Sequence, residues 1–169
     1  MNWLASVIAV LSIVLLLYVA MTDIAARLIS NTACLMLAVL ALTRLPFSNA
    51  PQLLTFIGGA SLLFLLLLIL YSRRYLGGGD VKLLAALSIG LPLLQLTQLL
   101  TVTALAGGVL ALLHLMMRFL PYPSRPPVGS SLLRRVYAVE RWRNLRHAPL
   151  PYGVAIACGG IWTVLSHGV

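Results

Sequence analysis

The stretch WLASVIAVLSIVLLLYVA, residues 3–20, is apolar throughout and ends three residues before Asp23. It has the length of a membrane-spanning helix, which needs about 17–25 residues. No basic residue precedes it and no small-residue cleavage site follows it, as a signal peptide would require. We therefore expect a retained membrane helix with a carboxylate near its end.

The rest of the chain has the same character. Of its 169 residues, 61% are hydrophobic and only 9% are charged, which is more apolar surface than a soluble domain of this size can bury. Five further apolar segments are predicted to be helices, at residues 32–45, 52–71, 81–96, 97–117 and 150–166. The sequence predicts an all-α, polytopic integral membrane protein with about six transmembrane helices, folded as one domain over residues 1–169.

Proline and glutamine residues indicate one segment boundary, and glycine pairs lie inside the segments. The boundary between the fourth and fifth, at residues 96 and 97, is based on Pro92, Gln95 and Gln98. Small pairs inside apolar helices allow close helix approach in lipid. We therefore expect three glycine pairs to serve helix packing: Gly58-Gly59, Gly107-Gly108 and Gly159-Gly160.

The basic residues indicate how the chain is oriented. With six spans, all twelve Lys and Arg residues except Arg44 fall in or beside the segments 21–31, 72–80 and 118–149, on one side. Such an excess marks the cytoplasmic side. Both termini are thus predicted to lie outside, with Asp23 and Asp80 at the cytoplasmic face.

The net charge of +9 bears on the partners of the protein. In a membrane protein, such a charge more often reflects topology and contact with anionic lipid than nucleic-acid binding. Residues 131–146, within the basic loop at about 118–149, are predicted to form an amphipathic helix on the anionic leaflet. The alternative is a surface that recruits a partner protein or the substrate. We expect no nucleic-acid partner, and no oligomeric state is predicted.

Metal and disulfide chemistry are not indicated. Cys34 and Cys158 lie in apolar segments, and the sequence has no CxxC and no Cys/His cluster. We expect no metal site and no cofactor. Both cysteines are interpreted as small buried residues in helix packing.

The chain has only three acidic residues, Asp23, Asp80 and Glu140. Glu140 lies in an arginine-rich stretch, whereas the two aspartates lie at the ends of apolar segments. A carboxylate near bilayer depth is costly and tends to mark a proton path, an ion site or a catalytic site. Two of them in a chain so poor in acids suggest a working pair.

Each aspartate also has a purely structural interpretation. Asp80 follows three glycines, whose backbone can adopt tight or left-handed conformations and allow close approach, and it can cap a helix starting near Val81. Asp23 can form an ion pair with Arg27, four residues further on. A phosphate-binding loop is disfavoured because the GxxxxGK[ST] spacing is missing.

Together, the two aspartates offer a mechanism. Two carboxyl groups brought close share a proton, because the pKa of one of them rises. The ionised partner can take a proton from a water that attacks a peptide carbonyl, and the protonated partner can donate to the carbonyl oxygen. Which aspartate is ionised stays open, because such a pair titrates as a unit.

Three stretches of the chain resemble one family. Gly77-Gly78-Gly79-Asp80-Val81-Lys82-Leu83 resembles the GxGDxKL form of type IV prepilin peptidases, which are GxGD membrane aspartyl proteases. Asp23, Arg27 and Ile29-Ser30-Asn31 resemble the first catalytic-aspartate motif of that family, with Ser30 where the family commonly has Pro. The segment 150–157 is similar to the closing PYG-A-A segment.

The resemblance implies roles for these residues. Asp23 and Asp80 would be the catalytic pair, and Gly77, Gly78 and Gly79 would shape the loop that presents Asp80. Asn31 and Lys82 are further candidates for shaping the loop or contacting the substrate. Asn31 orients Asp23 or a substrate backbone, or simply begins a helix, and Lys82 is interpreted as a snorkelling residue that sets topology.

The resemblance also implies a substrate and a location. The substrate would be an Flp/type IV-like prepilin, cleaved before its hydrophobic helix at the cytoplasmic face of the bacterial inner membrane. Asp23 follows directly on the first helix, without the zinc-binding cysteine region of bifunctional members. The chain therefore resembles the short TadV/CpaA form of tight-adherence (Flp) pilus systems, and we do not expect N-methyltransferase activity.

Two other classes of function remain as alternatives. A small transporter or proton-conducting protein would use the aspartates as a relay, with acids deeper in the helices and helices broken at mid-membrane. A non-catalytic pilus or secretion assembly component would tolerate Asn at both positions.

Overall fold

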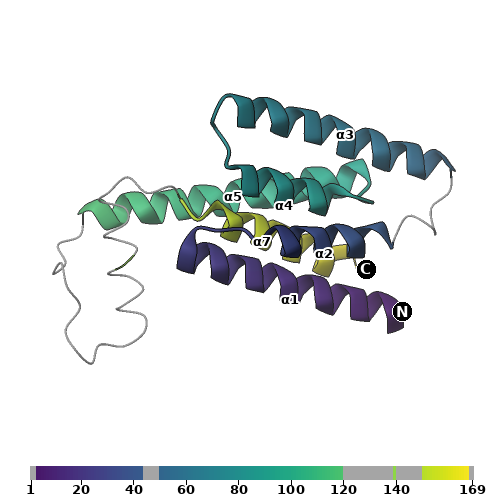
Figure 1. Cartoon of the computed structure of the whole chain (residues 1–169), viewed down its shortest axis with the longest axis horizontal. Coiled ribbons are helices and arrows are strands. Elements are labelled where there is room, and N and C mark those ends of the chain that lie inside the picture. The colour runs from purple at the N-terminus through teal and green to yellow at the C-terminus, as the bar shows by residue number, and fades with distance from the viewer. Residues whose placement is uncertain (1–2, 44–49, 120–138, 140–149, 168–169) are drawn as a thin grey trace. The chain divides into compact units, whose positions relative to one another are not determined.

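The computed structural model describes residues 3–43, 50–119, 139 and 150–167. Within these ranges the chain forms six helices and no strand, as predicted (Figure 1). The predicted amphipathic helix at 131–146, apart from residue 139, lies outside the described residues, as do Arg44 and Glu140. The helices are α1 (Trp3–Ala26), α2 (Asn31–Leu42), α3 (Ala50–Ser72), α4 (Gly78–Ser88), α5 (Leu93–Phe119) and α7 (Tyr152–His167).

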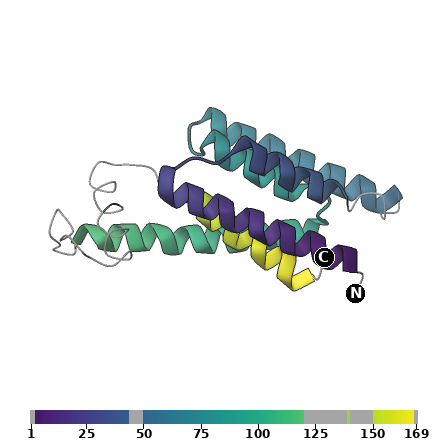
Figure 2. The ribbon, with the colours of Figure 1, turned by 60° about the horizontal axis from the view of Figure 1, so that its bottom comes forward.

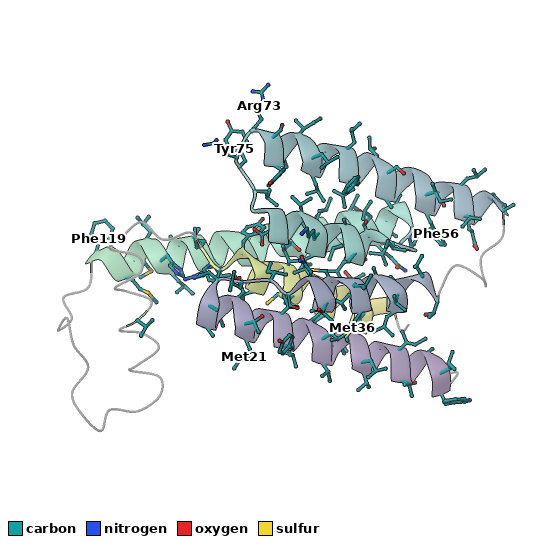
Figure 3. All side chains as sticks on the ribbon, viewed as in Figure 1. Met21, Met36, Phe56, Arg73, Tyr75 and Phe119 are labelled. Carbon is teal, nitrogen blue, oxygen red and sulfur yellow. The ribbon has the colours of Figure 1, made fainter. Side chains whose placement is uncertain are left out.

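Five of the six described helices are apolar. Residues 3–26, 50–72 and 93–117 are each long and apolar enough to cross a membrane, and α2 and most of α7 are shorter apolar helices. Large apolar side chains such as Met21 and Met36 stand out from the helices (Figure 3). Leu54, Leu62 and Trp162 are exposed as well. Lipid is the solvent that such surfaces require, so the protein is a polytopic membrane protein.

The chain divides into two compact units, residues 1–107 with 151–169, and residues 108–150. The second unit contains the C-terminal part of α5, up to Phe119. The first unit contains both aspartates and every residue assigned to the candidate site. The expectation of a single domain over 1–169 stays a prediction.

Helix α4 is the centre of the first unit. It packs against α2, α3 and α7, while α1 packs along α7 (Figure 2). The apolar core draws on all five of these helices, and its members include Leu16, Leu37, Leu67, Leu83 and Ile156. Because α2, α3 and α7 pack around α4, the core fixes the position of its first turn, which contains Asp80.

The predicted boundary between residues 96 and 97 is wrong. Helix α4 ends at Ser88, and α5 begins at Leu93, directly after Pro92. The break contains Gly90 in the left-handed region, with φ 71°, a conformation that side chains with a Cβ rarely adopt. At 11 residues, α4 is therefore only about 17 Å long, roughly half of the hydrocarbon thickness of a bilayer.

The packing predictions are confirmed in part. A Cβ on Gly160 would lie 2.9 Å from Cδ1 of Leu16, and one on Gly159 would lie 2.9 Å from the carbonyl oxygen of Leu99, so this pair does serve close packing. Gly58 and Gly108 meet nothing within 4 Å, and the prediction is wrong for them. Cys34 is buried as predicted, whereas Cys158 is exposed on α7, so the prediction of a buried residue is wrong for Cys158.

Candidate active site

Asp23 lies in the last two turns of α1 and is only 5% exposed. The helix continues beyond the apolar run of residues 3–20 and ends at Ala26. Arg27 follows in the left-handed region, with φ 56°, and its N–H donates to the Asp23 carbonyl oxygen at 2.9 Å. The chain therefore turns away immediately after α1 and leaves Asp23 fixed in a regular helix.

Asp80 lies in the first turn of α4, whose N-cap is Gly77. Its carboxylate accepts a hydrogen bond from the backbone N–H of Gly77. This is the reciprocal half of a capping box, in which an acidic side chain reaches back to the N-cap amide. Capping is thus one role of Asp80, and the helix begins three residues earlier than predicted, at Gly78.

The three glycines before Asp80 are needed for space. None of them has a positive φ, so none adopts the left-handed conformation that glycine permits. Close approach is confirmed, because a Cβ on Gly77 would lie 2.9 Å from Oδ2 of Asp80 and one on Gly79 would lie 3.1 Å from Cβ of Ile29. Ile29 belongs to the linker after α1, so this contact brings the end of the Asp23 helix onto the first turn of α4.

The two aspartates interact electrostatically. The pKa of Asp80 is raised from 3.8 to about 6, first by burial and then by the charge of Asp23, while the Gly77 hydrogen bond opposes the rise. Asp23 and Asp80 therefore converge, although they come from different helices. A carboxyl group with a pKa near 6 stays protonated up to a higher pH than a free aspartate does. A pair that shares one proton requires such a group.

Asn31 and Lys82, the two other polar residues of the motifs, contact each other. Nζ of Lys82 donates to Oδ1 of Asn31 at 3.0 Å. Asn31 is the first residue of α2, and Lys82 lies near the start of α4, so the bond joins the beginnings of these helices. Ser30, which stands where the family commonly has Pro, has φ −67°, the value that Pro imposes. This departure therefore leaves the backbone as Pro would set it.

The model of the type IV leader peptidase family matches residues 10–112. This chain belongs to the type IV leader peptidase family. The match covers more than half of the chain and includes both aspartates, Asn31, the glycine run and Lys82. No curated protein and no solved structure matches the chain.

The candidate site also includes a residue to which the sequence motifs assign no role. Gly153, in the first turn of α7, lies directly against the Asp23 side chain. Its neighbour Tyr152 is within electrostatic reach of Asp80. The signal for these residues is the PYG segment itself, because Tyr and Gly at a helix start suggest a contact that requires close approach.

Metal ligands are not gathered at this site. Across residues 3–43, 50–119 and 150–167, no three His, Cys, Asp or Glu side chains lie together as metal binding would require. The acidic groups that interact at this site are the carboxyl groups of Asp23 and Asp80. Such a pair can exchange protons with water and with a peptide bond.

Proposed function

We propose that this leader peptidase is an aspartic-type membrane endopeptidase with Asp23 and Asp80 as its catalytic pair. We further propose that it removes the leader of Flp/type IV-like prepilins at the cytoplasmic face of the inner membrane. The observation that carries the proposal is the raised pKa of Asp80, about 6, which has burial and the charge of Asp23 as its causes. A purely structural capping aspartate needs no second buried carboxylate beside it.

The chemistry follows from one shared proton. The ionised carboxylate accepts a proton from water as the water oxygen bonds to the carbonyl carbon of the leader peptide bond. The protonated carboxyl group donates its proton to the carbonyl oxygen, giving a neutral tetrahedral intermediate. The C–N bond then breaks, the carbonyl re-forms, and a proton passes to the leaving amine, which leaves one proton on the pair.

The surroundings of Asp80 suit an extended peptide. Gly77, Gly78 and Gly79 present backbone without side chains next to the carboxyl group. The exposed apolar faces of the helices allow the substrate's own hydrophobic helix to remain in lipid beside the enzyme. The carboxylate pair supplies local negative charge for a basic leader.

Anionic lipid is the second partner that we propose. The turn after α3 carries Arg73, Arg74 and Tyr75, and Tyr75 is 77% exposed. Arg73 and Tyr75 point away from the helices at this end of α3 (Figure 3). Basic and aromatic side chains together are typical of a membrane interface facing anionic headgroups.

The test is co-expression of the full chain with an Flp-type prepilin in bacterial membranes, with the pilin mass as the readout. Wild type, Asp23→Asn, Asp80→Asn and the control Gly58→Ala are compared at matched expression. Gly58 is a suitable control because a Cβ there meets nothing within 4 Å. We expect leader loss with wild type and Gly58→Ala, and a decrease of at least about 100-fold with either Asn variant, the scale of lost acid–base catalysis.

The other outcomes assign other functions. Equal cleavage by all four chains excludes the aspartate pair. If the wild type releases no leader, an Flp-type prepilin is not the substrate. Proton uptake into vesicles that is lost in both Asn variants would then support a relay. Restored pilus assembly by both Asn variants would indicate an assembly component.

A further inference from the structure

The first turn of α7 lies against one of the two aspartates. A Cβ on Gly153 would lie 2.9 Å from Oδ2 of Asp23, 3.1 Å from its Cγ and 3.2 Å from its Cβ. Gly153 does not have a positive φ, so its backbone conformation does not require glycine. The requirement is space, and the group that occupies this space is the Asp23 carboxylate.

Helix α7 has little freedom to move away from a side chain at position 153. The ring of Tyr152 fits against Gly107, where a Cβ would lie 2.8 Å from Cε2 of the ring. Further along α7, Gly160 is in the same kind of contact with Leu16. These contacts hold α7 on both sides of Gly153, and interiors packed this closely resist small displacements.

Asp23 itself is confined as well. It is 5% exposed, it belongs to a regular turn of α1, and α1 packs along α7. A methyl group at position 153 would therefore act on the carboxyl end of the side chain, the part that rotates most easily. The charge of Asp23 contributes to the raised pKa of Asp80. Rotation of the Asp23 carboxylate would therefore also change the pKa of Asp80.

We propose that Gly153 is a positioning residue that sets the orientation of the Asp23 carboxylate toward Asp80. The proposal rests on the proposed function for the role of the pair in cleavage, but the contact itself does not depend on the substrate. Gly153 touches no reacting atom, and it acts through Asp23. Displacement of a catalytic group by about 1 Å can cost about 100-fold in rate, which sets the scale of the expected effect.

The test compares Gly153→Ala with two matched glycine variants in the full chain in lipid nanodiscs. Gly160→Ala introduces the same methyl group into an equally crowded place on α7, against Leu16 and Leu87 and away from the aspartates. Gly58→Ala introduces it into open space. For each variant, kcat and KM for an Flp-type prepilin are measured separately. The pH midpoint for carbodiimide labelling of Asp80 is measured without substrate.

We expect Gly153→Ala to lower kcat by about 100-fold with little change in KM, and to shift the labelling midpoint of Asp80. Gly153→Ser should behave in the same way, because it introduces the same Cβ. Gly160→Ala should lower thermal stability but keep the wild-type midpoint, and Gly58→Ala should match the wild type in all readouts.

Two results would overturn the proposal. One is a wild-type kcat and midpoint in Gly153→Ala, and the other is an equal effect of Gly153→Ala and Gly160→Ala on the midpoint. If the wild type cleaves no prepilin, the proposed substrate fails, and the labelling midpoint still decides the role of Gly153. If the Asn variants are inactive and Gly153→Ala is fully active, only the positioning role fails.

Discussion

Lys82 donates a hydrogen bond from Nζ to Oδ1 of Asn31 at 3.0 Å, and this bond ties the start of α4 to the start of α2. Both residues belong to the motifs that contain the aspartates, but they lie on different helices. The bond therefore helps to register the first turn of α4, which carries Asp80, against the linker that leads from Asp23 to α2.

The Lys82–Asn31 bond should contribute little to overall stability because both residues are exposed. We expect Lys82→Met and Asn31→Ala each to lower the free energy of unfolding by less than about 1 kcal/mol. The double variant should lose no more than the larger of the two, because both changes remove the same bond. Denaturant unfolding in mixed micelles measures all three, and strict additivity would show that the bond contributes nothing.

The contact between Gly77 and Asp80 predicts a loss of activity on adding one methyl group. In Gly77→Ala the new Cβ would lie 2.9 Å from Oδ2 of Asp80 and would push the carboxylate away from the Gly77 amide. We expect kcat for prepilin to decrease about 10- to 100-fold, while alanine in place of glycine at the N-cap destabilises α4 by about 1 kcal/mol. Single-turnover cleavage gives the rate, and Gly58→Ala is the control. An unchanged rate would mean that the carboxylate has room that the structure does not show.

The pKa of Asp80 predicts how stability depends on pH. The pKa is about 6 in the folded protein against 3.8 ordinarily, so between these values the folded chain binds more protons than the unfolded chain. Stability from this group therefore falls as pH rises through that window and is lowest above about pH 6. Asp80→Asn removes the loss of stability that comes from ionising a buried carboxyl group, and its side-chain oxygen can still accept a hydrogen bond from the Gly77 amide.

Thermal unfolding in nanodiscs tests this expectation. The unfolding midpoint of Asp80→Asn relative to that of the wild type should be higher at about pH 8 than at about pH 3, where Asp80 is mostly protonated in both the folded and the unfolded chain. The same difference at both pH values would contradict a raised pKa in the folded protein. Asp23→Asn lowers the pKa of Asp80 only in part, because burial is the larger cause.

The end of α3 predicts a stabilising substitution. Arg74 has φ 59°, and its N–H donates to the Tyr71 carbonyl at 2.9 Å while the Tyr75 N–H donates to the Leu70 carbonyl at 3.0 Å. This is the Schellman arrangement, in which Gly usually occupies the left-handed position. Arg74→Gly should therefore leave stability unchanged or raise it by up to about 1 kcal/mol.

The neighbouring residue is the matched control for this substitution. Arg73 does not have a positive φ, and its N–H donates to the Ile69 carbonyl at 3.1 Å as in a regular helix. Arg73→Gly should lower stability by about 0.5–1 kcal/mol, the ordinary cost of glycine in a helix. If both variants lost the same stability, strain at Arg74 would be excluded. Thermal unfolding in neutral-lipid nanodiscs separates this backbone effect from binding to anionic headgroups.

The apolar runs predict the helices well because lipid exposure imposes long, uninterrupted segments. Because these segments are apolar throughout, their composition does not show where one helix ends and the next begins. The residues from Val81 to Leu96 are nearly all apolar, so composition does not distinguish the turn at Gly90 from the helices around it. Pro92 was the correct signal for the break, and the glutamines that follow it moved the predicted boundary too far along the chain.

The candidate site was predictable as far as it depends on rare residue types. Two aspartates in a chain with three acidic residues are conspicuous, and the structure does bring them into electrostatic contact. Gly153 could not be assigned in this way, because the PYG segment suggests a close contact at a helix start but does not identify the side chain of another helix that fills the space. The glycines before Asp80 suggested both backbone freedom and close approach, and the structure uses them for close approach to Ile29, Tyr71 and Asp80.

Two of the helices around the site are short. α2 has 12 residues and α4 has 11, about 17–18 Å each, and they pack against each other. A bilayer of about 30 Å hydrocarbon thickness adjusts to such hydrophobic mismatch by thinning locally or by tilting the protein. We expect cleavage in vesicles to slow as the lipid acyl chains are lengthened at constant headgroup charge. A rate independent of chain length would mean that the neighbouring long helices absorb the mismatch.

The early end of α4 also determines where non-helical backbone can lie. With Asp80 at the membrane face, as the sequence predicts, a helix of about 17 Å would end within the hydrocarbon region, where unsatisfied amides and carbonyls are costly. The structure meets this cost by burying Gly90 and Leu91 and by donating the Leu91 N–H to the Ser88 carbonyl at 3.3 Å. The enclosure of α4 by its neighbours thus acts as insulation, because it keeps the backbone of this turn away from any surrounding lipid.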